Sequence, residues 1–153
     1  MADRLTVGVA QVAPECTLEM NRGKIVRFIG QARAAGCRVV VFPEEALHVP
    51  DDTSRAAIDE AVEALCVAAR TQGIYVITGL LYRLTDADRL HNRLLAIAPD
   101  GSIVHSYDKL WADARFPNVP GPFEIDGTRC CAIICADRWI RSVEELPAFA
   151  GAS

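Results

Sequence analysis

The sequence lacks both a tract of basic residues and a long apolar run. Its 153 residues carry a formal net charge of −4, with a sequence pI near 5.3. An acidic chain without a basic patch has no electrostatic footprint for nucleic acid, so we expect no nucleic-acid partner. A membrane span needs roughly 18 consecutive apolar residues and no run approaches that length, so we expect no membrane partner. Residues 1–4 lead directly into a strand pattern without a signal-peptide core, which favours a cytoplasmic protein.

Cys-x-x-Cys pairs are also absent, although the chain has six cysteines. Because nothing marks secretion and most of the cysteines lie in or beside apolar runs, we expect free thiols in a reducing compartment. Cys130 and Cys131 would face opposite sides of a strand, which is poor geometry for zinc and favours a structural role for both. A metal or redox centre would need thiols brought together from separate strands, so we expect no cysteine-based metal or redox centre.

The composition, 51% hydrophobic and 24% charged, fits one globular domain over residues 1–153. Apolar spacing alternates between strand and helix periods, which predicts an α/β fold with a mixed sheet. Pro99-Asp100-Gly101-Ser102 predicts the turn of a hairpin. The predicted elements are strands over 5–12, 38–42, 74–81, 91–98, 103–108 and 129–135, a helix between Thr17 and Gly36, a helix over 54–72 ended by Gly73, a loop over 112–122, and a last helix from Ser142 to about Ala150.

Three chemically capable side chains lie at the ends of predicted strands: Glu44, Lys109 and Cys135. Ligands of open α/β sheets gather at the carboxyl ends of the strands. There a carboxylate can deprotonate a thiol and an ammonium can stabilise the thiolate. Taken singly, Glu44 fits a solvated acid, Lys109 a surface lysine and Cys135 a buried structural thiol. The catalytic interpretation depends on the three meeting at one sheet edge.

The segments around these residues resemble the catalytic motifs of the nitrilase superfamily of carbon–nitrogen hydrolases. Residues 40–44 (Val-Val-Phe-Pro-Glu) are similar to the motif that carries a catalytic Glu. Residues 107–110 (Tyr-Asp-Lys-Leu) are similar to the Lys motif, and residues 134–138 (Ile-Cys-Ala-Asp-Arg) to the Cys motif. Further matches are Gln11, Gly36, Gly79, Asn92 and Gly101.

The resemblance implies an αββα sandwich, with this chain as about the first half of the family's domain. It also implies a Glu-Lys-Cys triad that needs no metal or cofactor. Glu44 would be the general base, with Glu45 as the alternative, and Cys135 would attack an amide or nitrile carbon. Lys109 and the N–H of Ala136 would stabilise the oxyanion. Members usually pair through outer helices, so we expect a homo-oligomer.

The residues after the nucleophile favour the amidase and carbamoylase branches, with a small amide as substrate. Nitrilases tend to have Cys-Trp-Glu, which is absent here. Arg138 and Trp139 would line the acyl pocket, or else pack beneath the nucleophile loop. The family's additional Glu has no match after Lys109, and Asp113 and Glu124 are the nearest candidates. The alternative is a non-catalytic, truncated module with a structural or partner-binding role.

Overall fold

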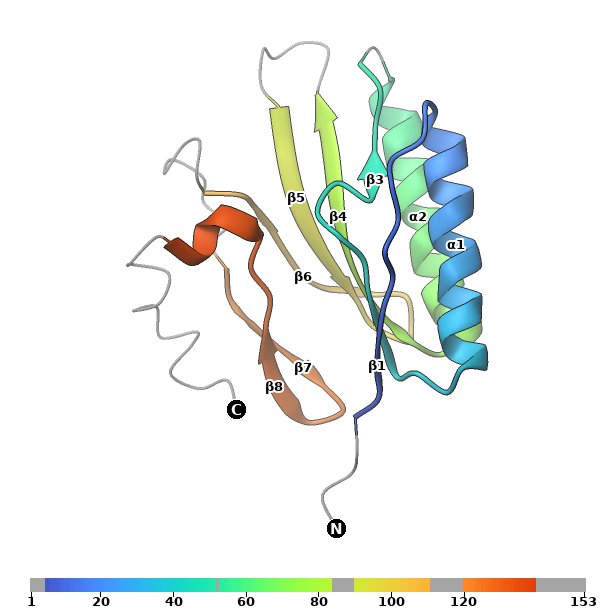
Figure 1. Ribbon diagram of the computed structural model, residues 1–153, viewed down its shortest axis with the longest axis vertical. Coiled ribbons are helices and arrows are strands. Elements are labelled where there is room, and N and C mark those ends of the chain that lie inside the picture. The colour runs from blue at the N-terminus through green and yellow to red at the C-terminus, as the bar shows by residue number, and fades with distance from the viewer. Residues whose placement is uncertain (1–4, 52, 84–89, 111–119, 140–153) are drawn as a thin grey trace.

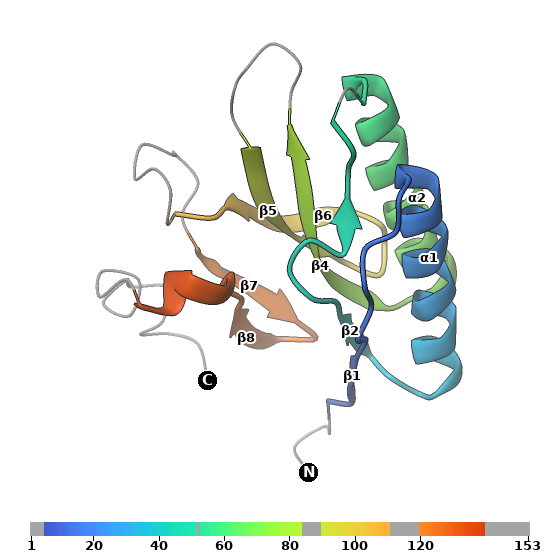
Figure 2. The same cartoon turned by 45° about the horizontal axis from the view of Figure 1, so that its top comes forward.

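The computed structural model of the protein places a mixed sheet between a pair of helices and a second, two-stranded sheet (Figures 1 and 2). The structure describes residues 5–51, 53–83, 90–110 and 120–139. Its elements are β1 (Val7–Val9), α1 (Leu18–Ala34), β2 (Val39–Val41), β3 (Leu47–His48), α2 (Arg55–Gln72), β4 (Tyr75–Arg83), β5 (Leu90–Ile97), β6 (Ile103–Asp108), β7 (Pro122–Ile125), β8 (Thr128–Cys131) and the 3₁₀ helix η1 (Cys135–Trp139).

The larger sheet has the order β1-β2-β4-β5-β6, with β3 pairing beside β4. Strands β1, β2 and β4 are parallel, whereas β4, β5 and β6 are antiparallel. The helices α1 and α2 provide the long connections that parallel neighbours need, and Gly101, at φ +86°, turns the β5–β6 hairpin. The predicted mixed sheet is therefore confirmed.

Local side-chain chemistry sets the limits of both helices. The hydroxyl of Thr17 accepts a hydrogen bond from the Met20 N–H at 3.2 Å, and Ser54 caps α2 through the Ala57 N–H at the same distance. These bonds satisfy donors that a helix N-terminus leaves without intrahelical partners. Gly73 ends α2 in the left-handed conformation at φ +61°, which a residue with a Cβ adopts only with strain.

The sheet buries a separate apolar cluster on each face. On one face, the helices contribute Ile25, Ile29 and Leu65 to the main core. On the other face, Phe123 and Ile125 of β7 pack near Val39 of β2. The helix-sheet-sheet order of layers follows from these two clusters, because each layer buries one apolar side against the central sheet.

The prediction of one strand over 129–135 was wrong. β8 ends at Cys131, opposite Pro122, the first residue of β7. The N–H of Gly121, just before β7, donates to Nε2 of His105 on β6 at 3.3 Å, so the chain has already turned toward the larger sheet. Without a longer partner strand, the apolar run beyond Cys131 cannot extend the ladder. Cys135 instead begins η1 with φ +42°.

Three further elements differ from prediction. β1 covers only Val7–Val9 of the strand predicted over 5–12. β3 was not predicted, and β7 begins at Pro122, inside the predicted loop over 112–122. The predicted helix from Ser142 lies outside the described residues. Neither α1 nor α2, the helices in the described part of the chain, is both long and apolar enough to cross a membrane.

One part of the sheet face opposite the helices has no cover within the described residues. Val7 and Val9 pair with Val39 and Val41, so all four side chains lie on this face. The β1 side chains are nevertheless 48% and 82% exposed, because the β7–β8 pair packs over β2 and β4 rather than over β1.

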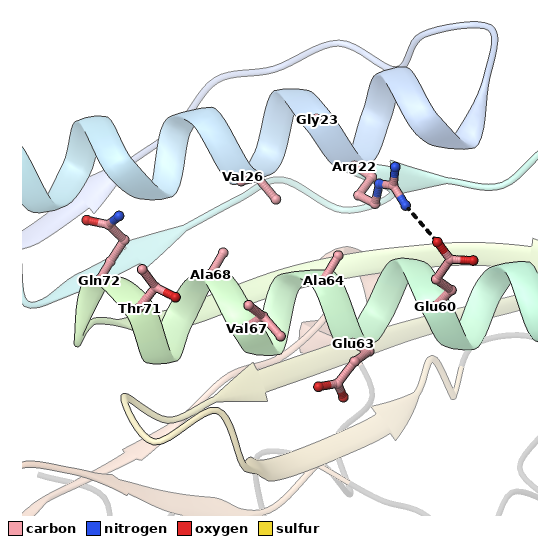
Figure 3. A pocket seen from close by; sticks show the side chains of 10 residues that line it. All are labelled: Arg22, Gly23, Val26, Glu60, Glu63, Ala64, Val67, Ala68, Thr71 and Gln72. Atoms are coloured by element: carbon pink, nitrogen blue, oxygen red, sulfur yellow. Dashed lines mark hydrogen bonds and ion pairs between the residues drawn. The ribbon is translucent and has the colours of Figure 1, made fainter.

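The outer surfaces of α1 and α2 form a shallow groove of about 660 Å³ (Figure 3). Val26 of α1 and Val67 of α2 are both exposed in it. Arg22 of α1 reaches across to Glu60 of α2 at 3.5 Å (Figure 3). An exposed ion pair of this kind contributes about 1 kcal/mol at most, so apolar burial beneath the groove holds the helices.

The buried face of α1 gives a direct test of this packing. Ile25 is fully buried, so Ile25→Ala should lower the free energy of unfolding by about 2–5 kcal/mol. Met20 lies on the same helix but is 52% exposed, so Met20→Ala should change it by less than about 0.5 kcal/mol. Urea denaturation of both variants would measure the difference, and equal losses would contradict the assigned face of α1.

Candidate active site

The structure brings the three predicted residues together. Glu44 lies in the turn that follows β2, Lys109 follows β6, and Cys135 begins η1. Lys109 Nζ donates to Glu44 Oε1 at 2.5 Å, and the Cys135 thiol is within hydrogen-bonding reach of the same carboxylate. Lys109 and Cys135 follow Glu44 in the chain by 65 and 91 positions, yet the three residues meet at one edge of the sheet.

Close backbone packing fixes the turn that carries Glu44. The Phe42 N–H donates to the Ile77 carbonyl at 2.8 Å, which holds the end of β2 against β4. Beyond it, Glu45 adopts φ +63°. A Cβ at Gly79 would lie 2.6 Å from the Glu45 nitrogen and 2.9 Å from the Glu44 Cα, so only glycine fits there.

Asn92 of β5 also binds Glu44. Its Nδ2 donates to Glu44 Oε1 at 2.6 Å, and its backbone carbonyl accepts from the Lys109 N–H at 2.7 Å. Sequence reasoning matched Asn92 to the family but missed this contact. The match to the family was the only available signal, because Asn92 lies between the polar residues His91 and Arg93 in β5.

The pKa values of Glu44 and Lys109 move apart. Burial raises the pKa of Glu44, but hydrogen bonds from Lys109 and Asn92 outweigh it and hold the pKa below its usual value. For Lys109, burial lowers the pKa, while the bond to Glu44 and its charge raise it above the usual value. The pair is therefore ionised at neutral pH. Of the two candidate bases, Glu44 is the one that forms an ion pair with Lys109.

Two hydrogen bonds hold the segment around Cys135 against β6. The Ile134 N–H donates to the hydroxyl of Tyr107, and the Leu110 N–H donates to Oδ2 of Asp137 at 3.2 Å. Tyr107 and Asp137 are both fully buried, and burial raises the pKa of the Tyr107 hydroxyl. Cys135 itself is exposed, so the turn presents its sulfur to a ligand.

The remaining predicted residues lie near the nucleophile or away from the site. Ala136 is half-buried, while Arg138 and Trp139 are exposed on η1, with the guanidinium 4.5 Å from the Trp139 ring centroid. Glu124 is exposed on β7, and Asp113 lies outside the described residues. Cys130 and Cys131, expected to be structural, are half-buried, and burial raises the pKa of both thiols.

A small cavity adjoins the Glu44 carboxylate and Cys135. It measures about 130 Å³, and apolar side chains, among them Ile77 and Leu94, line most of it. Its other wall comes from residues 132–135, between β8 and η1. Within the four described ranges, no three His, Cys, Asp or Glu side chains cluster in a way that would hold a metal ion.

Comparisons with known proteins bear on the family and the fold of the chain. Residues 6–143 match the carbon-nitrogen hydrolase family. The fold is similar to that of an amidase from Nesterenkonia sp., with a TM-score of 0.79, 19% identity, and coverage of 97% of this chain and 62% of that one. A double mutant of the Nesterenkonia sp. AN1 amidase in complex with acrylamide matches with TM-score 0.80, 18% identity and the same coverages.

A mutant of that amidase in complex with butyramide gives a TM-score of 0.79 at 19% identity, covering 97% of this chain and 62% of that one. The chain therefore spans less than two thirds of the length of the amidases it matches. No curated protein matches it at a significant level.

The close approach at Gly79 can be tested by adding one methyl group. Gly79→Ala should displace the Glu44 turn and lower the free energy of unfolding by about 1–3 kcal/mol, as overpacking does. Gly23→Ala in α1 is the matched control, because a Cβ there meets nothing within 4 Å. That control should be neutral or raise stability by up to about 1 kcal/mol. Thermal unfolding of both variants would test this expectation. A melting temperature of Gly79→Ala equal to that of the unaltered protein would contradict the close approach of Gly79 to the Glu44 turn.

Proposed function

We propose, from the premise that the chain belongs to the carbon-nitrogen hydrolase family, that it contributes the Glu-Lys-Cys centre of an amide hydrolase. One observation carries the proposal: the Glu44–Lys109 ion pair lies within hydrogen-bonding reach of Cys135, beside a cavity of acyl size. A structural thiol would need neither an exposed sulfur nor a carboxylate partner that is ionised at neutral pH.

The reaction begins when Glu44 takes the proton of the Cys135 thiol. The thiolate attacks the amide carbon, and its electron pair forms the new C–S bond while the carbonyl oxygen becomes an oxyanion. Lys109 and the N–H of Ala136 stabilise that charge. Collapse of the oxyanion breaks the C–N bond, and protonated Glu44 returns the proton to the leaving ammonia. Glu44 then deprotonates a water that hydrolyses the thioester, which releases the acid and restores the thiol.

The cavity favours a small amide with a short apolar acyl group. Its volume of about 130 Å³ corresponds to about four water molecules at roughly 30 Å³ each. Because its lining is mostly apolar, an acyl chain gains by leaving water there, while a charged one would lose hydration. The Nesterenkonia amidase has been captured with acrylamide and butyramide, two amides of this size. Arg138 and Trp139, exposed beside Cys135, would contact the rest of the substrate.

A second candidate is a non-catalytic module that binds a partner. It is favoured by the exposed Val7 and Val9, because apolar side chains on an inter-sheet face are covered in a completed sandwich. The expectations of a homo-oligomer and a cytoplasmic location are compatible with either function. The α1–α2 groove, with exposed Val26 and Val67, is the surface we expect to pair.

Removing the nucleophile separates these candidates. Cys135→Ala and Cys135→Ser should each lower ammonia release from a short amide by about 10⁴-fold or more. Cys66→Ala is the control, since Cys66 is buried in the main core, away from the site, and should lower stability but not turnover. Full turnover by either Cys135 variant would contradict the assignment.

The iodoacetamide reaction tests the same thiol without turnover. Cys135, beside Glu44, should be alkylated faster than Cys16, which is also exposed, and much faster than Cys66, whose pKa burial raises. Equal rates at Cys135 and Cys16, measured by peptide mass spectrometry, would support the non-catalytic candidate.

The acyl preference follows from the cavity. Acetamide and butyramide should have a kcat/KM at least about tenfold above that of benzamide, since each CH₂ or ring carbon that does not fit loses about 1 kcal/mol of burial and adds strain. Ile77→Ala should enlarge the cavity and lower the ratio of kcat/KM for the short amides to that for benzamide. Val67→Ala, in the α1–α2 groove, is the control and should leave that ratio unchanged. Preference for benzamide by the unaltered protein would show that this cavity does not take the acyl group.

A further inference from the structure

In the part of the chain that the structure describes, two nitrogen donors reach the Glu44 carboxylate, and both bind the same oxygen. Asn92 Nδ2 lies 2.6 Å from Oε1 and Lys109 Nζ lies 2.5 Å from it. No nitrogen donor among the described residues binds Oε2. The two oxygens of one carboxylate therefore have different surroundings, and Oε2 keeps its lone pairs available for a proton.

Asn92 is better suited than Lys109 to hold the carboxylate in this orientation. It lies on β5, paired with β4 on one side and β6 on the other, and its carbonyl also fixes the Lys109 backbone. Its short side chain loses little freedom, whereas the lysine chain has four methylene groups that allow the ammonium to move. An ammonium that must also follow the oxyanion cannot be the fixed anchor.

The other end of the Asn92 amide shows that this contact is costly. Asn92 Oδ1 is buried and has no hydrogen-bond partner among the described residues. A buried, unsatisfied acceptor costs free energy, so a purely structural position would favour an apolar residue. Rotating the amide would turn Oδ1 toward the negative Glu44 carboxylate. The observed orientation, with the donor on Glu44, is the one that this charge selects.

We propose that Asn92 is a positioning residue for Glu44: it fixes Oε1 together with Lys109 and leaves Oε2 as the oxygen that accepts the Cys135 proton. This role rests on the proposed function only in its last step, because the anchoring of the carboxylate is independent of turnover.

The anchoring has a definite effect on the titration of Glu44. The charged or titratable groups facing the carboxylate are Lys109 from the end of β6 and Cys135 from η1, with Glu45 adjacent in the chain. The charge of Asp137, which also lies on η1, acts on Lys109. The Asn92 hydrogen bond favours ionised Glu44, so its loss should raise the pKa of Glu44 and move the acid limb of kcat/KM to higher pH.

Two variants of nearly equal size test this. Asn92→Leu removes the donor, and Asn92→Asp replaces it with a carboxylate that repels Glu44. Carbon-13 NMR of labelled Glu side chains, with the Glu44 signal assigned by its loss in Glu44→Gln, should show a higher Glu44 pKa in Asn92→Leu and a higher one still in Asn92→Asp. In both variants kcat/KM should fall roughly 10- to 100-fold, as for a displaced catalytic group. Asn21→Ala, which removes a buried amide bonded only to backbone, should leave the Glu44 titration unchanged.

The wild-type chain supplies a measurement that needs no variant. The Asn92 side-chain N–H signals should follow the Glu44 titration, since one of these protons is bonded to Oε1. The proposal would be overturned by an unchanged Glu44 pKa in a folded Asn92 variant. It would also be overturned if the Asn92 N–H signals of the wild-type chain did not shift as Glu44 titrates. A shifted Glu44 pKa in a protein that hydrolyses no amide would instead refute the proposed function and leave the anchoring of Glu44 in place.

Discussion

The half-buried carboxylate of Glu44 is the constraint around which this end of the sheet is arranged. Removed from much of its water, it remains ionised only because Lys109 and Asn92 supply hydrogen bonds that replace hydration. Those donors come from the end of β6 and from β5. The antiparallel half of the sheet therefore supplies the hydrogen bonds to a carboxylate in the turn that follows the parallel strand β2. An error in the register of either half would leave the carboxylate without its partners.

The second sheet contributes to the site because its last strand ends shortly before the tight turn that carries Cys135. β8 is only four residues long, and the chain then bends so that Cys135 has a positive φ. Such a conformation costs free energy in a residue with a Cβ and persists only where its surroundings fix it. Tyr107 and Asp137, both buried, provide that fixation by accepting hydrogen bonds from neighbouring backbone N–H groups.

Local patterns predicted most of the fold, and long-range contacts decided the rest. The strand over 103–108 and the helix over 54–72 followed from alternation, periodicity and the helix-ending Gly73, which act within a few residues. The end of β8 depended on where its partner begins, at Pro122, and periodicity does not contain that information. The meeting of Glu44, Lys109 and Cys135 was predicted through strand ends and resemblance. The Asn92 contact was missed because Asn92 lies within β5, and reasoning from the residues that follow strands did not include it.

Strand β1 leaves backbone groups uncovered as well as the side chains of Val7 and Val9. Among the described residues its backbone pairs only with β2, so one row of N–H and C=O groups on its other side is open to another extended segment. Open edges of this kind promote intermolecular strand addition, and natural proteins restrain it by keeping them short or charged. With three residues, β1 offers few such groups, and the net charge of −4 makes copies of the chain repel one another. Self-association at this edge should therefore grow as salt screens that repulsion, and ionic strength becomes the variable that controls it.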